Sequence, residues 1–489
     1  MNNRRGFLKF LGATGIGLSS GVSILNAGNS DRFSDYKAIV FLYLAGGNDG
    51  INTFPPIIDD AKRGFENYTN IRNNIRINKQ ELNLPESGGE LDLSSGNPYE
   101  KNNNLVDAYT KGYYTVDGFD LGFNALMPEL AHLAKRGKVA LFANMGNLIE
   151  PSSKEELKNQ QKPLPPFLFA HNHQTKLTQN GEAALLDYTG WAGRVADLLG
   201  DVNGGSIYGL NIAISRDMHL FDGNSSSSLV INANGPSKYW RLRSRAVYDA
   251  MIDAPKNNKL EAYYAKKREH SFWVSDSISK DWNESIDWSS KKNAYGGELF
   301  SMPSNQELSQ KSPVFADKSM LLRFKAVAKL LHIGKSKGLK RQIFSIYDGG
   351  YDTHNNQSQQ HARKLRGLSL ALGDFYKALE AMGMENDVLV ISASDFGRST
   401  GNNGDGSDHA WGSNYFALGG SINGGVYGTL PDLTLGSEDD YTKKGRLIPT
   451  TSFTQYYATA CKWFGLSDSE LDLIFPELKN FNNKNLGYC

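Results

Sequence analysis

The chain has 489 residues, and 39% of them are hydrophobic, which is enough for one large buried core or for more than one domain. Its net charge of +1 gives no electrostatic case for binding nucleic acid or an acidic membrane surface. The two cysteines, Cys461 and Cys489, form no C-x-x-C motif. This excludes a cysteine zinc site and a disulfide-stapled fold, and it leaves a single disulfide between the two thiols open.

The N-terminal residues have the pattern of an export signal. Arg4 and Arg5 stand in MNNRRGFLKF, and a Gly-rich apolar stretch follows from 10 to 25. We predict a twin-arginine signal peptide over 1–27, cleaved near Ala27, and a linker over 28–36. The alternative, a membrane anchor, would need a longer and more apolar stretch, and no other segment is suited to a stable transmembrane span. The expected location is the periplasm or the cell surface, with the twin-arginine translocase as a partner during export.

Apolar runs alternate with amphipathic stretches along the rest of the chain, and both faces of the first run are apolar. Such strands are buried on both sides, as in a parallel sheet, and their alternation with helices predicts an α/β fold. The strands are expected at 37–45, 139–144, 343–347, 387–394 and 414–418, and the main helices at 128–137, 316–335, 357–384 and 451–464. We predict a single α/β domain over 37–489, with a mostly parallel central sheet.

Two polar regions interrupt this alternation. The interval 59–116 is Asn-rich, and the interval 200–313 mixes short strand-like runs with a charged helix. Both are interpreted as insertions on the core that could cover a site.

Acidic and histidine residues follow three of the predicted strands and occupy one adjoining loop. Ligand sites in open α/β sheets form beyond the carboxyl ends of the strands, so we expect these side chains to share one rim. The candidate metal ligands are Asp49, Asp352, His354, Asp395, Asp408 and His409. Carboxylates and imidazoles without thiolates suit zinc, manganese, magnesium or calcium.

Each of these motifs also has a purely structural explanation. Asp49 could form an ordinary Asx turn, and Asp352 could cap the helix that follows it. Asp395 could cap a turn and pair with Arg398, and Asp408 lies in a loop where polar residues are common. The convergence of the set favours a metal or polyanion site over these separate explanations.

The motifs in chain order resemble those of the domain-of-unknown-function 1501 family, a group of exported proteins in the alkaline-phosphatase-like superfamily. The segments that carry the resemblance are VFLYLAGGNDGINT, LFAHNHQ, GGYDTHNNQ, SDFGR and SDHAWGSNYFALGG. The resemblance implies an alkaline-phosphatase-like fold with helices on both faces of the sheet. It implies Asp49 as a first-strand ligand, Asp352 with His354 on one metal, Asp395 on another, and His409 completing a site. Arg398 is expected to hold a phosphate or sulfate group with its planar guanidinium.

Two departures from the family pattern bear on catalysis. Ala170 stands where the related phosphatases carry a hydroxyl nucleophile, and Phe396 stands where a histidine commonly follows the aspartate. A hydrolase of phosphate or sulfate esters would therefore need a metal-bound water as nucleophile. His171 or His173 would act as general acid or base.

The missing hydroxyl equally favours a non-catalytic envelope protein that binds a polysaccharide or an exported partner. Aromatic residues that could stack on sugar rings lie in the second polar region, although core packing is the commoner role of such residues: Tyr239, Trp240, Trp273, Trp282 and Trp288. The expected ligand is thus a small anionic ester or a polysaccharide, and the sequence leaves enzyme and binder open.

Overall fold

The central sheet is built around strand β1 (Lys37–Ala45), in which eight of the nine residues are buried. The computed structural model describes residues 32–95, 105–236, 245–256, 258–303 and 317–489. Alternate side chains of β1 enter two different cores, with Val40 and Leu42 on one face and Phe41 and Tyr43 on the other. This is the period of two that a strand buried on both faces requires.

Nine strands form the sheet, in the order β15-β7-β14-β11-β1-β10-β8-β9, with β16 paired to β7. Neighbours are parallel except at β14, which runs antiparallel to both β11 and β7. The prediction of an α/β fold with a mostly parallel sheet is confirmed. The strands are β7 (Val139–Gly146), β8 (Asn211–Ile214), β9 (Leu229–Ile231), β10 (Arg341–Gly349), β11 (Val388–Ala393), β14 (Ser413–Gly419), β15 (Gly425–Gly428) and β16 (Thr451–Ser452).

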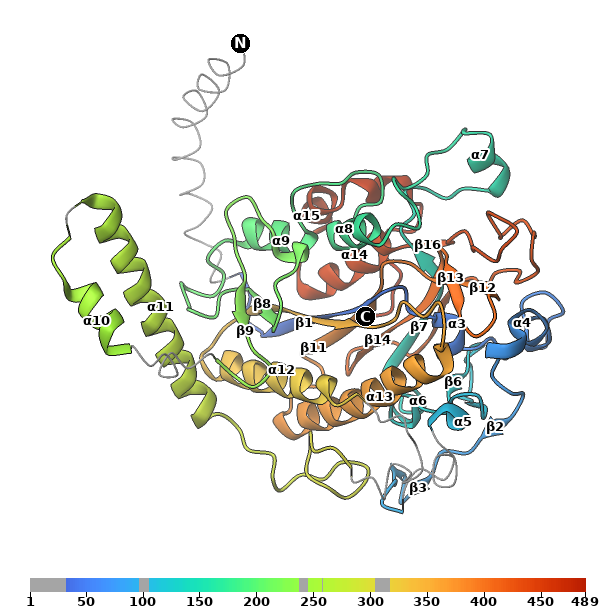
Figure 1. Ribbon diagram of the computed structural model, residues 1–489, viewed down its shortest axis with the longest axis horizontal. Coiled ribbons are helices and arrows are strands. Elements are labelled where there is room, and N and C mark those ends of the chain that lie inside the picture. Colours follow the sequence, from blue (N-terminus) through green and yellow to red (C-terminus); the bar gives the residue numbers. More distant parts are fainter. Residues whose placement is uncertain (1–31, 96–104, 237–244, 257, 304–316) are drawn as a thin grey trace, which may run out of the picture.

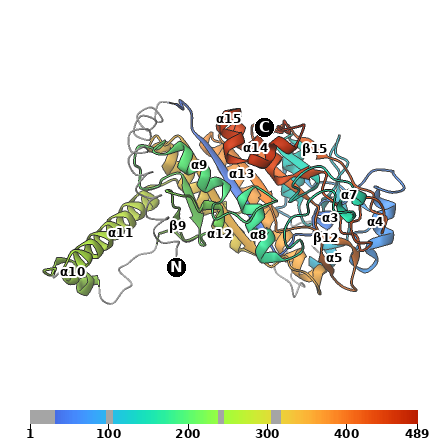
Figure 2. The ribbon, with the colours of Figure 1, turned by 90° about the horizontal axis from the view of Figure 1, so that it is seen from above.

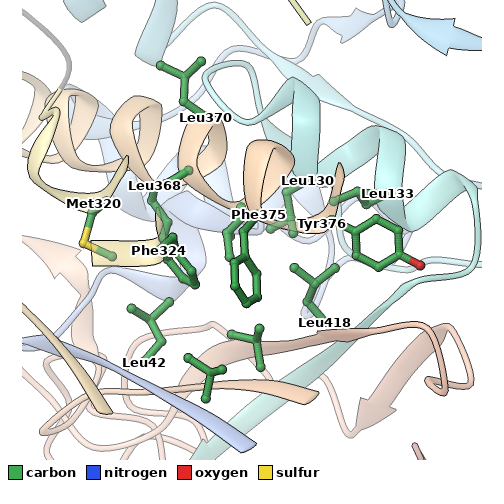
Figure 3. Packing of buried hydrophobic residues seen from close by; sticks show 14 of the residues in the cluster. Leu42, Leu130, Leu133, Met320, Phe324, Leu368, Leu370, Phe375, Tyr376 and Leu418 are labelled. Carbon is green, nitrogen blue, oxygen red and sulfur yellow. The ribbon is translucent and has the colours of Figure 1, made fainter. Parts of the chain in front are cut away.

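Helices cover both faces of this sheet (Figure 1). One face packs on α6 (Pro128–Lys135), α12 (Ser319–Ser336) and α13 (Gln357–Met382). Figure 3 shows Phe324 and Phe375 of these helices above Leu42 and Leu418 of the sheet. The other face packs on α9 (Trp191–Leu199), α14 (Phe453–Phe464) and α15 (Asp468–Ile474). The layers are therefore helix, sheet and helix.

The two polar regions differ from the predicted insertions. Within 59–116, the buried side chains of Leu82, Leu93 and Leu105 join the main core, so this region packs on the domain. Within 200–313, β8 and β9 extend the sheet itself, and what projects from the domain is the helical pair α10 (Arg245–Asp253) and α11 (Lys259–Glu284). Periodicity alone does not distinguish two such short strands from an irregular insertion.

Shorter elements complete the described chain. They are α3 (Gly50–Thr53), α4 (Phe65–Arg72), η1 (Asn73–Ile75), β2 (Glu81–Leu82), β3 (Glu86–Ser87), β4 (Glu90–Leu91), α5 (Leu105–Tyr109), β5 (Tyr113–Tyr114), β6 (Phe123–Asn124), α7 (Lys154–Lys158), α8 (His171–Asn180), η2 (His219–Phe221), β12 (Arg398–Asn402), β13 (Ser407–His409) and η4 (Pro476–Asn480).

Three sequence predictions concern the ends of the chain and its cysteines. The predicted signal peptide, 1–27, lies outside the described residues and stays a prediction. Within the described ranges, no helix has the length and apolar character that crossing a bilayer requires. Cys461 and Cys489 are both free thiols, and burial raises the pKa of each.

Candidate metal centre and its cleft

Three histidines and one aspartate converge beyond the carboxyl ends of β10 and β11. Asp352 and His354 follow β10, His409 ends β13, and His171 begins α8. The Nε2 atom of His409 lies 3.0 Å from Nε2 of His171 and 2.9 Å from Nε2 of His354. The same atom lies 3.2 Å from Oδ1 of Asp352, and Nε2 of His354 lies 3.1 Å from that oxygen. Four side chains from three distant segments thus meet here: His409 and Asp352 lie close to both other histidines, and His171, Asp352 and His409 form the group with ligand atoms mutually within 4.8 Å.

The partner of the outer nitrogen, Nδ1, shows where the proton of each neutral ring lies. Where Nδ1 carries the proton, the inner nitrogen, Nε2, faces the centre with a lone pair. Nδ1 of His409 lies 2.9 Å from the backbone oxygen of Phe169, which can only accept, so this nitrogen carries the proton in a neutral ring. Nδ1 of His171 lies 2.6 Å from Oδ2 of Asp395, and Nδ1 of His354 lies 3.3 Å from Oδ1 of Asp408. All three Nε2 lone pairs then face inward, beside a carboxylate.

Neutral rings in this arrangement repel one another, and either a metal ion at the centre or a proton on one Nε2 would relieve that repulsion. A tetrahedral ion bound at ~2.0–2.1 Å separates its ligand atoms by roughly 3.3–3.4 Å. The observed separations approach that value, and His171, Asp352 and His409 each offer a ligand atom within 4.8 Å of the others. A metal-bound histidine almost always donates its other N–H to a carboxylate or carbonyl, as all three do here. The donor set therefore fits a divalent ion.

Asp395 and Asp408 are placed differently from their prediction as metal ligands. Asp395 is buried and accepts hydrogen bonds from Tyr43 Oη at 2.6 Å and from His171 Nδ1. Asp408 faces the outer nitrogen of His354 and accepts from Asn403. Each carboxylate faces the outer nitrogen of a histidine from outside the centre.

Backbone strain accompanies the loop that delivers His171. Phe167 and Phe169, just before α8, have φ angles of 52° and 75°, a region that bulky side chains rarely adopt. The strained turn aims the oxygen of Phe169 at His409 and starts α8 beside the centre. Phe396 packs against the rings of both His171 and His409, with centroids 4.7 Å apart in each case. Outliers of this kind concentrate at functional sites.

Arg398, predicted to hold a phosphate or sulfate group, is placed against Asp352 and Ser407. Its side chain is buried, and NH1 donates to Asp352 Oδ1 at 2.8 Å and to the oxygen of Gly46. The remaining nitrogens face Ser407, so the guanidinium has no fork to offer a substrate. Burial works to raise the pKa of Asp352, but the hydrogen bond and charge of Arg398, together with the charges of His171 and His354, hold that pKa below its usual value. Arg398 thus keeps Asp352 ionised and oriented.

The electrostatics of the rings differ between the two half-buried histidines. Burial works against protonation of His171, but Asp395 outweighs it and raises the pKa of the imidazole. Burial lowers the pKa of His409, and nearby His171 and Arg398 add to that effect. At neutral pH the imidazole of His409 is therefore uncharged, and its Nε2 lone pair is available to a metal ion.

Asp49, predicted as a metal ligand, lies outside the cluster of His171, His354, His409 and Asp352. It caps α3 by accepting from the backbone N–H of Asn52. Its oxygens also form a buried ion pair with Arg72 and accept from Gln357. Asp49 therefore has a structural role as a helix cap. Its ion pair with Arg72 of α4 occupies the carboxylate oxygens that would otherwise face the edge of the sheet.

His173 also lies outside the centre. Its ring stacks on Phe167 at 4.0 Å, and its buried Nδ1 has no hydrogen-bond partner among the described residues. The histidine two positions earlier, His171, is a candidate ligand instead of the acid or base that was predicted. The sequence signal for this was the motif LFAHNHQ, which marks the segment without saying which imidazole faces inward.

A cleft of 540 Å³ opens beside the centre, with His171, Asp352 and Asp395 among its lining residues. Lys176 of α8 and Arg216, just after β8, supply positive charge to its wall, and Asp217 supplies one negative charge. The Arg216 guanidinium lies 4.2 Å from the ring centroid of Tyr347. Ser215, which precedes Arg216, has a φ of 68°, so a strained turn directs this arginine. The cleft therefore leads from two cations to the centre.

The sequence profile of a family described as "Protein of unknown function (DUF1501)" matches residues 36–455. A search of curated proteins finds no match. Similar solved structures include a sulfatase from Pseudoalteromonas sp. (10% identity, TM-score 0.28, covering 95% of this chain and 77% of that one). A second is the lipoteichoic acid synthase from Listeria monocytogenes (8% identity, TM-score 0.33, covering 96% of this chain and 80% of that one). A third is a phosphonate monoester hydrolase from Silicibacter pomeroyi (9% identity, TM-score 0.30, covering 70% of this chain and 69% of that one). These TM-scores are too low to carry a further argument, and the fold is defined by the strand order of this chain itself.

Proposed function

This chain belongs to the family described as "Protein of unknown function (DUF1501)", and we propose that it is an exported, metal-dependent hydrolase of phosphate or sulfate esters. The observation that carries the proposal is the set of three inward-facing Nε2 atoms beside the Asp352 carboxylate, next to a cleft with cations on its wall. His171, His354, His409 and Asp352 would hold the ion.

The donor set narrows the choice of metal. Imidazole nitrogen suits zinc and similar transition metals, whereas magnesium and calcium favour oxygen ligands. Three histidines and one carboxylate therefore favour zinc or manganese over magnesium and calcium, and zinc most of all. When bound, such an ion supplies Lewis acidity and lowers the pKa of water.

The residues of the chain divide the remaining tasks. Arg398 and Asp395 hold Asp352 and His171 in place through hydrogen bonds of 2.8 and 2.6 Å. Lys176 and Arg216 would bind the anionic group of an ester as it enters the cleft. These two cations on the wall of the cleft are the reason for proposing an anionic ester as the substrate class.

Among the described residues that line the cleft, Thr175 is the one serine or threonine that could replace the missing nucleophile. Ala170 is the residue that precedes α8, and it has no hydroxyl. Thr175 lines the cleft, but its Oγ1 lies 2.9 Å from the Tyr43 hydroxyl, which in turn donates to Asp395. Its hydroxyl is thus held in the network that orients His171, and we assign the attack to water.

The test is metal content and hydrolysis measured on the same preparations. We expect the folded protein to hold near-stoichiometric zinc or manganese by mass spectrometry and to hydrolyse an aryl phosphate or an aryl sulfate. The Asp352→Ala/His354→Ala variant should lose both, and Ala170→Ser should keep the metal and raise turnover. His270→Ala, which removes an exposed histidine from α11, is the matched control. A wild-type protein that folds without any metal would overturn the proposal.

Ala170 also favours a second candidate, a non-catalytic binder of a polysaccharide or an exported partner. Of the aromatic residues suggested for sugar stacking, Trp288 is buried and Trp282 packs against the core, while Trp273 is exposed. Tyr239 and Trp240 lie outside the described residues. Stoichiometric metal without turnover of any phosphate or sulfate ester, in wild type and in Ala170→Ser, would favour the binder.

A further inference from the structure

The two helices α10 and α11, here called the arm, project from the domain on the side of β9 (Figures 1 and 2). Of the described residues of the 26-residue helix α11, only Phe272 and Ile278 are buried. Ile278 joins the main core, so this part of α11 fixes the arm to the domain. The N-terminal half of α11 lies beside α10, away from the central sheet (Figure 1).

The arm carries a concentration of exposed apolar side chains. Eleven large hydrophobic side chains are exposed among the described residues, and five of them lie on these two helices. They are Val247, Leu260, Tyr263, Tyr264 and Trp273, with exposed fractions from 55% to 75%. Scattered exposed side chains are ordinary, but a cluster on a projecting element marks an interaction surface.

A groove of 670 Å³ runs between the two helices. Apolar side chains form most of its lining, including Ile252, Pro255, Leu260 and Tyr264. Arg268 also lines it, with its guanidinium carbon 5.4 Å from the ring centroid of Tyr264. The groove therefore has an apolar floor and a cationic edge.

The charge of the arm is uneven along its length. Residues 245–284 contain seven lysines and arginines and seven aspartates and glutamates, whereas the stretch 254–270 contains five lysines and arginines and two glutamates, a local balance of +3. Lys259, Lys266 and Lys267 are exposed on α11. Positive charge is thus placed beside the apolar cluster.

We propose that the arm docks on an anionic lipid surface. A helix that presents tyrosine, tryptophan and leucine together with lysine and arginine matches the composition of interfacial helices. The apolar side chains would enter the boundary of the acyl chains, and the lysines would meet lipid phosphates. The stretch 254–270 of a second copy would carry the same local positive charge, which disfavours pairing of two arms through this stretch.

The test is co-sedimentation of the full mature chain with phosphatidylcholine vesicles, with and without phosphatidylglycerol. Wild type should bind only the anionic vesicles, and salt should weaken binding because it screens exposed charges. Lys266→Glu/Lys267→Glu should weaken binding at least about tenfold. Leu260→Ser/Tyr264→Ser should do the same without changing the charge.

Matched controls separate this surface from general stickiness and from unfolding. Tyr188→Ser and Leu473→Ser remove side chains that are 92% and 68% exposed away from the arm, and they should bind as wild type does. Thermal unfolding confirms that each variant folds. Absence of wild-type binding to anionic vesicles, or equal binding by the arm variants, overturns the proposal, as does an arm-dependent dimer in light scattering without lipid. The His354→Ala variant should bind vesicles normally, so this test is independent of hydrolysis.

Discussion

Asp49 and Asp352 follow neighbouring parallel strands, β1 and β10, and each is paired with a buried arginine. The Asp49 side chain is 1% exposed and is enclosed by Arg72, Gln357 and a helix cap, whereas that of Asp352 is 45% exposed and faces three imidazoles. The two aspartates differ in how many of their carboxylate oxygens are already bonded to other side chains of the protein. A strand-end aspartate becomes available to a ligand only where its neighbours leave that side open.

Removal of His354 should have the largest effect on the open site. The side chain is 43% exposed, so His354→Ala leaves no large cavity, and the free energy of unfolding without added metal should change by less than about 0.5 kcal/mol. Bound metal and hydrolysis should both be lost, because one of four ligands is absent. Metal analysis beside chemical denaturation checks this, and retention of stoichiometric metal would remove His354 from the centre.

Asp49→Ala should show the reverse pattern. It leaves the Arg72 guanidinium buried without its carboxylate, and Arg72 Nε already has no hydrogen-bond partner among the described residues. Breaking such a pair costs about 3–5 kcal/mol of stability, which denaturant unfolding would measure. Asp472→Ala removes an exposed pair with Lys484 and should cost less than about 1 kcal/mol. Metal bound per folded molecule should stay unchanged, and its loss would return Asp49 to the metal site.

The sequence located the edge of the sheet that carries the site but could not separate these two aspartates. Strand periodicity and Gly-rich strand ends placed β1, β10 and β11, because those signals are local. The pairing of Asp49 with Arg72 depends on the packing of α4, which no local pattern encodes. The entry of His171 depends on positive φ angles at Phe167 and Phe169, for which bulky residues give no sequence signal.

Asp374 extends the comparison to a buried aspartate without an arginine in contact. It accepts from the backbone N–H of Phe300 at 2.6 Å, and burial raises its pKa to about 7. A pKa raised on folding means that stability is fully present below about pH 4 and is lost as pH rises through about 7. Because the pKa rises from 3.8 to about 7, Asp374→Asn should flatten a fall in stability on the order of 4 kcal/mol.

Unfolding measured between pH 4 and 8 checks the slope of Asp374. Asp317 provides the opposite sign: burial works to raise its pKa, but Lys364 outweighs it and lowers the pKa to about 2. Asp317→Asn should therefore flatten a loss of stability that occurs as pH falls below about 4. An unchanged slope above pH 4 in Asp374→Asn would show that this carboxyl titrates normally.

The two carboxylates outside the centre give the smallest and most discriminating contrast. Asp395 is 3% exposed and lies 2.6 Å from His171 Nδ1, whereas Asp408 is 44% exposed and lies 3.3 Å from His354 Nδ1. Asp395→Asn should weaken metal binding about 10- to 100-fold, as expected for loss of a buried partner that orients a ligand. Asp408→Asn should weaken it less than about fivefold, since exposed pairs contribute about 0.2–1 kcal/mol. Competition with a chelator measures both, and equal effects would mean that burial does not set the strength of these outer contacts.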